Sequence, residues 1–288
     1  MKNYLFPFLF VSIFNVFSML SQTNTFSLNI KQDKNMWQNF TYDLGNMAGG
    51  MGYAYTRPLY WKKKQFVNLV YVTAGTASLY TIDDHVDEWA NGWRNDVPRW
   101  VTNYGNDIGS PNNNFMLTGA VYLTGLFTKS PKLRRTGVLL ISSAAASGLL
   151  QQVSKRIIGR ARPKANVGKD VFDPFHIDRV FNYDSFPSGH TMLGFTNAYA
   201  IAKHFESPWI KAGLYTIGSI PGISRIIDRF HWISDVAFST VISIFIVEAI
   251  DKFLDSKYDQ KYNDQRKQKK VAWDLQVTPQ SFGVKMNF

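Results

Sequence analysis

The chain has 288 residues, no cysteine and a net charge of +11 at neutral pH. The lack of cysteine excludes disulfides, thiol catalysis and thiolate metal sites, and 22 Phe, 14 Tyr and 8 Trp exclude a disordered main body. The positive charge favours anionic partners, either phosphate-bearing molecules or an anionic membrane surface. Because the basic residues occur in short clusters between apolar stretches, without a nucleic-acid-binding motif, we expect no nucleic-acid partner.

The N-terminus predicts a targeting segment. Lys2 precedes an apolar run from Tyr4 to Leu20, and small and polar residues follow it. This order is typical of a secretory signal peptide, which we expect over residues 1–21. An uncleaved membrane anchor is the alternative, because the run is only slightly shorter than a membrane span. The signal peptide would send the protein to the cell envelope.

Residues 22–64 predict an N-terminal extension of loops or short irregular elements, since they are polar and aromatic and contain Gly49, Gly50 and Gly52. The next part, residues 65–254, predicts an all-α core of six helices. The expected helices cover residues 65–82, 115–128, 136–154, 190–204, 210–220 and 231–254.

The hydropathy of these helices is marginal for membrane spans. A span needs about 20 mainly apolar residues, whereas the mean hydropathy is −0.18 and the last helix carries Asp235 and Glu248. The basic clusters lie at one end of the helix set, which places the other end outside the cytoplasm. Six crossings after a cleaved signal would instead place that end inside. Because these arguments conflict, we expect a peripheral bundle that faces the periplasm, with a membrane-embedded bundle as the alternative.

The C-terminal part, residues 255–288, predicts a charged helix extension or linker followed by a short β-hairpin. From Val271 onward, apolar residues alternate with period two on both sides of Thr278-Pro279-Gln280. Such alternation is the pattern of two strands joined by a turn. We expect the hairpin to pack on the bundle or on a partner.

Three short blocks between residues 155 and 235 are the most specific features of the chain. In the last block, His231 and Asp235 are four residues apart at the start of an expected helix, so their side chains lie on one face. We expect Asp235 to accept a hydrogen bond from Nδ1 of His231, which would leave Nε2 exposed as a base or nucleophile. Alone, the pair is more typical of a surface pair or half a metal site.

The middle block, Pro187-Ser188-Gly189-His190, precedes another expected helix. Its backbone N–H groups, the Ser188 hydroxyl and the helix N-terminus can bind an anion. Gly189 allows the backbone to approach closely, and His190 is suited to donating a proton. Alone, the block is also typical of an ordinary helix N-cap.

Lys155, Arg162 and Arg225 supply positive charge that can bind phosphate oxygens and stabilise a transition state. Arg160 is a further candidate, although its position two residues from Arg162 can direct it elsewhere. Each cation alone is typical of a solvated loop. Together the blocks fix eleven residue identities, each expected at about 5% from average usage, so their joint occurrence excludes coincidence.

The pattern Lys-x6-Arg-Pro, Pro-Ser-Gly-His and Ser-Arg-x5-His-x3-Asp resembles the signature of the type 2 phosphatidic acid phosphatase and vanadium haloperoxidase superfamily. The expected helices between about 65 and 252 fit the six-helix core of that family. The resemblance implies that His231 attacks phosphorus and forms a phosphohistidine, that Asp235 orients it, and that His190 protonates the leaving group. It implies that the phosphate oxygens are held by Lys155, Arg162, Ser188, Gly189 and Arg225. It also implies no metal and no cofactor, because fixed cations do the electrostatic work.

The expected activity is hydrolysis of a phosphomonoester or pyrophosphate, carried by a lipid rather than by a small soluble ester. A vanadate-dependent haloperoxidase is one alternative, in which the same cations would hold vanadate and His231 would bind it, although the chain is short for that group. A non-catalytic binding protein of the envelope is another.

Substrate choice is expected to depend on two segments that join the blocks and the helices, residues 83–114 and 164–186. Their aromatic side chains either line a channel for an acyl or prenyl group or pack beneath a loop. These residues are Trp89, Trp93, Trp100, Phe172, Phe175, His176 and Phe181.

Overall fold

The protein is described by a computed structural model that covers residues 35–175, 181–262, 272–278 and 281–287, with side chains described as far as residue 258. The expected signal peptide, residues 1–21, lies outside the described residues. So does the first part of the expected N-terminal extension, as far as residue 34.

The described residues form nine α-helices, so the expected count of six is wrong, although each of the six expected segments is helical. The helices are α2 (Met36–Thr56), α3 (Lys63–Thr81), α4 (Asp83–Trp93), α5 (Arg99–Ile108), α6 (Pro111–Phe127), α7 (Pro131–Ile158), α8 (Gly189–Ala202), α9 (Pro208–Ile227) and α10 (Ile233–Tyr262). Short 3₁₀ turns follow α2 and interrupt the α7–α8 connection at Arg57–Tyr60, Pro163–Ala165 and Phe181–Tyr183. The predicted mainly α-helical core is confirmed.

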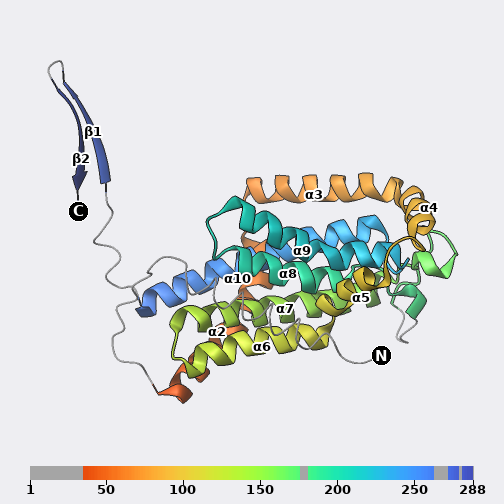
Figure 1. Cartoon of the computed structure of the whole chain (residues 1–288), viewed down its shortest axis with the longest axis horizontal. Coiled ribbons are helices and arrows are strands. Elements are labelled where there is room, and N and C mark those ends of the chain that lie inside the picture. The colour runs from red at the N-terminus through yellow and green to blue at the C-terminus, as the bar shows by residue number, and fades with distance from the viewer. Residues whose placement is uncertain (1–34, 176–180, 263–271, 279–280, 288) are drawn as a thin grey trace.

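The bundle is built around α7, which packs against α6, α8, α10 and α2, while α8 packs against α9. Figure 1 shows α6 to α10 lying side by side along the long axis of the molecule. Their common core is mainly apolar, with Val138, Leu139, Leu140, Val247 and Ile250 fully buried. Since successive helices reverse direction, the end of α7, the start of α8, the end of α9 and the start of α10 meet at one end of the bundle.

The prediction of irregular structure over residues 22–64 is wrong for α2. Its first turn is capped by Asn35, whose side chain accepts a hydrogen bond from the backbone N–H of Gln38 (2.9 Å). The glycines suit close helix packing rather than a loop: a Cβ on Gly49 would lie 2.7 Å from the ring of Phe253 on α10. Small residues at this contact therefore let α2 approach α10, and α2 becomes part of the bundle.

Helices α4 and α5 occupy the acidic, Trp-rich stretch for which the sequence predicted only a connection. Asp83 and Asp87 are one turn apart on α4 and both are buried. On α5, a Cβ on Gly105 would lie 2.5 Å from Cβ of Ser224, so α5 packs closely on α9. Both helices cover the end of the bundle where the three blocks lie (Figure 1).

Two helices among the described residues are long and apolar enough to cross a membrane, judged by length and composition: α7, and α10 over Ile233–Tyr258. Only 39% of the α10 window is buried inside the fold. Helix α3 has no buried residue and exposes Phe66, Val70 and Tyr71. Large exposed apolar surfaces mark contacts with a membrane or a partner. The expectation of a peripheral bundle is therefore not supported.

At the C-terminus, α10 continues to Tyr262 before the chain leaves the helix. Strands β1 (Ala272–Thr278) and β2 (Ser281–Asn287) pair antiparallel, with Ala272 opposite Asn287 and Thr278 opposite Ser281. The two strands lie apart from the helices in Figure 1. The expected turn residues Pro279 and Gln280 lie outside the described part of the chain.

Candidate active site

The antiparallel helix order brings the three blocks together at one end of the bundle. Lys155 lies in the last turn of α7, which Gly159 ends in the left-handed region (φ 58°) by donating its N–H to the Lys155 carbonyl (3.0 Å). Ser188 directly precedes α8, and Arg225 lies in the last turn of α9. His231 occupies the short loop between α9 and α10. Residues up to 76 positions apart in the sequence therefore share one site.

The three expected phosphate-binding cations are buried, with Lys155 8%, Arg162 7% and Arg225 7% exposed. Nε of Arg162, and Nε and Nη2 of Arg225, have no hydrogen-bond partner among the described residues. The carboxylate of Asp228 lies 3.6 Å from Nη2 of Arg225, which is too far for a hydrogen bond. Buried donors without acceptors are costly. Such donors on neighbouring arginines form a site suited to an anion.

Aromatic rings pack against the flat faces of the two arginine guanidinium groups. The guanidinium of Arg225 lies 4.7 Å from the ring centre of Phe230, and that of Arg162 lies 4.2 Å from the ring centre of Phe181. Lys164 also contacts the ring of Phe230, at 5.0 Å. Cation–π contacts occupy the faces of a guanidinium and leave its N–H edges for hydrogen bonds. Sequence reasoning missed Phe230, although it immediately precedes His231.

Burial of these cations disfavours their charged forms. It lowers the pKa of Arg162 to about 10, and the neighbouring charge of Arg225 contributes to the lowering. The group nevertheless stays charged at neutral pH. A cluster of buried positive charges that nearby carboxylates such as Asp228 and Asp184 offset only in part is typical of a ligand site.

The middle block differs from an ordinary N-cap. Ser188 occupies the N-cap position of α8, but its side chain makes no capping hydrogen bond. Instead its oxygen accepts a hydrogen bond from the Thr191 hydroxyl (2.8 Å), while its backbone N–H donates to the Ser239 hydroxyl (2.8 Å). The Ser188 hydroxyl therefore keeps its own proton for another acceptor. A Cβ on Gly189 would lie 2.4 Å from the Gln151 amide, so a larger residue here would have to displace that side chain of α7.

His190, at the start of α8, lies next to the positive charges. Burial, followed by the charges of Arg225, Lys155 and Arg162, lowers the pKa of His190 from 6.5 to about 4. The imidazole is therefore neutral at pH 7 in the ligand-free site. A bound anion would offset the surrounding cations and raise this pKa.

The expected direct contact between Asp235 and His231 is wrong. Nδ1 of His231 lies 2.5 Å from the backbone carbonyl of Ser185, whereas Oδ2 of Asp235 lies 4.0 Å away. A carbonyl oxygen only accepts, so Nδ1 carries the proton and Nε2 is left with its lone pair. Oδ2 of Asp235 accepts from the Ser185 hydroxyl (2.6 Å) and from the backbone N–H of Trp232 (3.0 Å). Asp235 therefore reaches His231 through Ser185.

Protonation of His231 is disfavoured at this position. Burial, and then the nearby charges of Arg162 and Lys155, lower the pKa of His231 well below 6.5. The imidazole is neutral at pH 7, with Nε2 available as a nucleophile or base.

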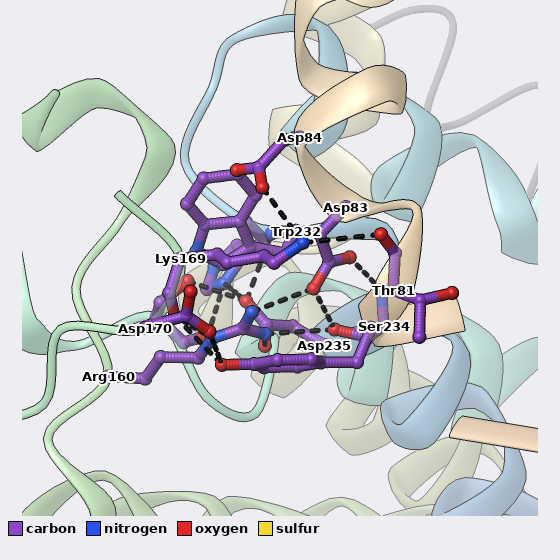
Figure 2. A network of polar contacts seen from close by, with 12 residues as sticks. Thr81, Asp83, Asp84, Arg160, Lys169, Asp170, Trp232, Ser234 and Asp235 are labelled. Carbon is purple, nitrogen blue, oxygen red and sulfur yellow. Dashed lines mark hydrogen bonds and ion pairs between the residues drawn. The ribbon is translucent and has the colours of Figure 1, made fainter. Parts of the chain in front are cut away.

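Arg160 does not join the phosphate-binding cations. Its Nη1 donates to Oδ1 of Asp235 (2.6 Å) and its Nη2 donates to Oδ2 of Asp83 (2.7 Å), as Figure 2 shows. The sequence offered no signal for Asp83, which lies 77 residues away on α4. Ser185 was missed because its main contact to His231 is made by a backbone atom.

The aromatic residues expected to control substrate choice are exposed, apart from His176, which lies outside the described residues. The others are therefore not buried beneath a loop, although Phe181 packs against Phe230 and Arg162. Their side chains are open to the surroundings by 44% to 74%: Trp89, Trp93, Trp100, Phe172, Phe175 and Phe181. A channel for an acyl or prenyl group stays a prediction.

The sequence model of the PAP2 superfamily matches residues 136–256, which contain all three blocks. This segment of the chain is therefore similar to the type 2 phosphatidic acid phosphatase (PAP2) superfamily.

Two curated relatives are similar over the same region. The lipid A 1-phosphatase of Porphyromonas gingivalis is 34% identical over 119 residues, which are 39% of this chain and 23% of that protein. The lipid A 1-phosphatase of Rhizobium etli is 34% identical over 105 residues, 35% of this chain and 42% of that protein. The match thus spans less than half the length of either relative. A solved PAP2-type phosphatidylglycerolphosphate phosphatase from Bacillus subtilis has a TM-score of 0.47 and 19% identity, covering 68% of this chain and 98% of its own.

Proposed function

We propose that the protein is a phosphatase that hydrolyses a phosphomonoester carried by a lipid, through a covalent phosphohistidine on His231. One observation carries this proposal: buried, unpaired N–H donors of Arg162 and Arg225 lie beside a histidine whose tautomer is fixed. An anion satisfies the donors, and the free Nε2 of His231 supplies the nucleophile.

Substrate binding places the phosphate among the positive charges. The N–H edges of Arg162 and Arg225, the ammonium of Lys155 and the hydroxyl of Ser188 bind its oxygens, together with the first backbone N–H groups of α8. The same groups stabilise charge on the equatorial oxygens in the transition state. Because the rings of Phe181 and Phe230 fix the guanidinium planes, little reorganisation is needed at that moment.

The first chemical step forms one bond and breaks one. Nε2 of His231 bonds to phosphorus while the P–O bond to the lipid alkoxide breaks, and His190 gives its proton to that oxygen. His190 acquires this proton when the phosphate dianion enters, because the bound negative charge raises its lowered pKa.

The second step releases phosphate. A water oxygen attacks phosphorus, His190 accepts the proton of that water, and the P–N bond breaks to restore His231. The proton that His190 gave to the alkoxide is thereby returned, and the balance is one water consumed for one alcohol and one phosphate.

A lipid substrate is supported by the surroundings of the site. The curated relatives are named for removing phosphate from lipid A, and α7 and α10 are candidate membrane spans. Trp89, Trp93 and Trp100 are exposed on α4 and α5, the helices beside the site. Exposed tryptophans are typical of the membrane–water interface. We therefore propose that the protein acts in the cell envelope, with its site at the level of lipid headgroups.

The reaction is proposed to need no metal and no cofactor, because the fixed cations supply the positive charge. Activity that persists in excess EDTA is the expected result. Activity that disappears with EDTA and returns with a divalent cation would contradict this part.

The decisive experiment measures phosphate release by the full chain in detergent micelles. Lipid A, phosphatidic acid, phosphatidylglycerol phosphate, undecaprenyl pyrophosphate and a soluble phosphoester form the panel. We expect release from at least one lipid, abolished by His231→Ala and retained by His85→Ala, a matched change at an exposed histidine on α4.

Two results would overturn the proposal. One is a His231→Ala protein that still releases phosphate at the rate of the unchanged chain. The other is halide oxidation with added vanadate and hydrogen peroxide by a protein that releases no phosphate from any substrate, which would favour the haloperoxidase alternative.

A further inference from the structure

A buried charge cluster lies behind His231, and two of its members, Asp83 and Arg160, have no role in the chemistry described so far. The guanidinium of Arg160 joins two carboxylates, Asp83 at 2.7 Å and Asp235 at 2.6 Å. Arg160 is 2% exposed, Asp83 1% and Asp235 0%. Figure 2 shows the three side chains meeting between the start of α4 and the start of α10.

We infer that Asp83 and Arg160 are positioning residues for His231: Asp83 holds the Arg160 guanidinium, which orients the Asp235 carboxylate and the Ser185 carbonyl that fixes the imidazole. This inference rests on the proposed function, since it assigns a role within that reaction.

Arg160 controls the contacts of His231 through two branches. Its side chain binds Oδ1 of Asp235, whose other oxygen accepts the Ser185 hydroxyl proton. Its backbone carbonyl accepts the N–H of Ser185 (3.0 Å). Both branches end at Ser185, the residue whose carbonyl accepts Nδ1–H of His231. A shift of Arg160 therefore moves the acceptor of the nucleophile.

Asp83 adds a second anchor on the helix that follows His231. Its Oδ1 accepts the backbone N–H of Ser234 (3.0 Å) and its Oδ2 accepts the Ser234 hydroxyl (2.6 Å). A carboxylate at this place satisfies an N–H that has no intrahelical partner and interacts favourably with the positive end of the helix dipole. Asp83 lies outside the matched segment 136–256, so a part of the chain beyond the family match completes the site.

The remaining surface of Arg160 is also occupied, which rules it out as a phosphate ligand. Its Nε donates to the Lys169 carbonyl (3.3 Å), and its guanidinium lies 4.5 Å from the ring centre of Tyr80 and 5.3 Å from that of Trp232. With edges and faces both in use, the guanidinium has one defined position.

The charge of the cluster also suits the first chemical step. Two carboxylates and one guanidinium leave a net charge of −1 behind His231. When Nε2 bonds to phosphorus while Nδ1 keeps its proton, the imidazole ring gains positive charge. A fixed negative charge nearby stabilises that ring most in the transition state and the intermediate. The cluster should therefore act on kcat rather than on substrate binding.

The test compares Arg160→Gln, Arg160→Lys and Asp83→Asn with the matched control Asp84→Asn, a half-exposed neighbour on α4 that pairs with Lys169 at the surface. We expect Arg160→Gln and Asp83→Asn to lower kcat about 10- to 100-fold, since small misplacements of a reacting group cost this much. KM should stay within about twofold, because the phosphate-binding cations are untouched. Asp84→Asn should keep the kcat of the unchanged chain.

A double variant separates positioning from a general loss of stability. Because Asp83 acts mainly through Arg160 and only in part through Ser234, the kcat loss of Asp83→Asn/Arg160→Gln should be smaller than the product of the two single losses. Arg160→Lys keeps the positive charge but loses the two separate Nη donors that bind Asp83 and Asp235. Its kcat should lie between those of Arg160→Gln and the unchanged chain. Sulfate binding by calorimetry should be unchanged in every variant that folds.

Several results would overturn the inference while leaving the proposed function intact. They are a folded Arg160→Gln or Asp83→Asn protein with unchanged kcat, a rise in KM at constant kcat, or losses that multiply in the double variant. If Arg160→Gln does not fold, Asp83→Asn and Arg160→Lys decide by the same kcat and KM criteria. A wild-type chain that releases no phosphate would instead contradict the proposed function itself.

Discussion

The two ends of the bundle bury arginines in opposite ways. Near the start of α7, Arg134 is fully buried and binds both oxygens of Asp43, at 2.7 and 3.0 Å. The hydroxyl of Tyr258 donates to the same carboxylate (2.6 Å). At the other end, Arg162 and Arg225 are almost as buried, but they face aromatic rings and keep donors unpaired.

This difference separates a structural charge from a functional one. A buried arginine with its own carboxylate belongs to the fold, and removing one partner leaves an uncompensated charge. A buried arginine whose donors lack a hydrogen-bonded carboxylate is stabilised further when a ligand brings the anion. Four experiments would test this distinction, and their expected effects range from a large loss of activity to a small change in proton uptake.

The largest effect is expected from Arg225→Met. It should lower kcat/KM about 100- to 1000-fold, because one fixed donor to the transition-state oxygens is lost. Since the guanidinium makes no hydrogen bond to a carboxylate among the described residues, and its ion pair with Asp228 is long (3.6 Å), the free energy of unfolding should fall much less than in Arg134→Met. Phosphate-release kinetics and urea unfolding in detergent measure the two quantities. A large loss of stability would show that Arg225 is structural, as Arg134 is.

Arg134→Met should do the reverse. It leaves the Asp43 carboxylate buried without its cation, so the free energy of unfolding should fall by about 3–5 kcal/mol. The kcat of the folded fraction should be unchanged, because the cluster lies far along α7 from the blocks. Urea unfolding, with activity normalised to folded protein, is the measurement. An Arg134→Met protein of unchanged stability but lower kcat would contradict the assignment of Arg134 to the fold and not to the active site.

A bound anion should stabilise only one of these variants. Phosphate at a concentration of about 100 times its Kd should raise the free energy of unfolding of the unchanged chain by about 2.7 kcal/mol. The same increment is expected for Arg134→Met, and at the same phosphate concentration little or none for Arg225→Met. An equal increment in all three would place the phosphate elsewhere.

The smallest expected effect is a pH dependence of stability and of anion binding that originates from His190. In the ligand-free site the pKa of His190 is lowered to about 4, so the folded state disfavours a proton that the unfolded chain takes up near pH 6.5. Stability should therefore fall as the pH drops from about 6.5 toward about 4. A dianion raises the pKa, so sulfate binding at pH 6 should take up protons. Calorimetry in two buffers measures this uptake, which should be smaller in His190→Asn. Equal uptake in both proteins would exclude His190 as its source.

The sequence predicts the helices whose apolar runs are long, and fails where packing depends on small residues. All six expected segments are helical because their apolar faces are extensive. Helix α2 was missed because Gly49 and Gly50 are typical of loops, and only the contact with Phe253 and Ile250 shows why they suit a helix. The short helix α4 was missed because its buried positions include Asp83 and Asp87, and α5 was missed because its buried positions are Thr102 and Gly105.

In the site, the order of the blocks predicts which residues share one end of the bundle, and the structure places all of them there. The partners of the nucleophile could not be predicted. Nδ1 of His231 binds a backbone carbonyl, which every residue possesses, so no side-chain pattern identifies Ser185. Asp83 is distant in sequence, and its buried pairing with Arg160 is visible only after folding.

The central claim is that His231 becomes covalently phosphorylated during turnover. Rapid acid-free quenching with a ³²P-labelled lipid phosphate tests it directly. We expect a burst of acid-labile, base-stable phosphoprotein, approaching one label per chain if breakdown of the intermediate limits the rate, mapped to His231 and absent from His231→Ala. Turnover that releases labelled phosphate at the full rate, with no labelled protein at any time and with His231→Ala still active, would contradict the account.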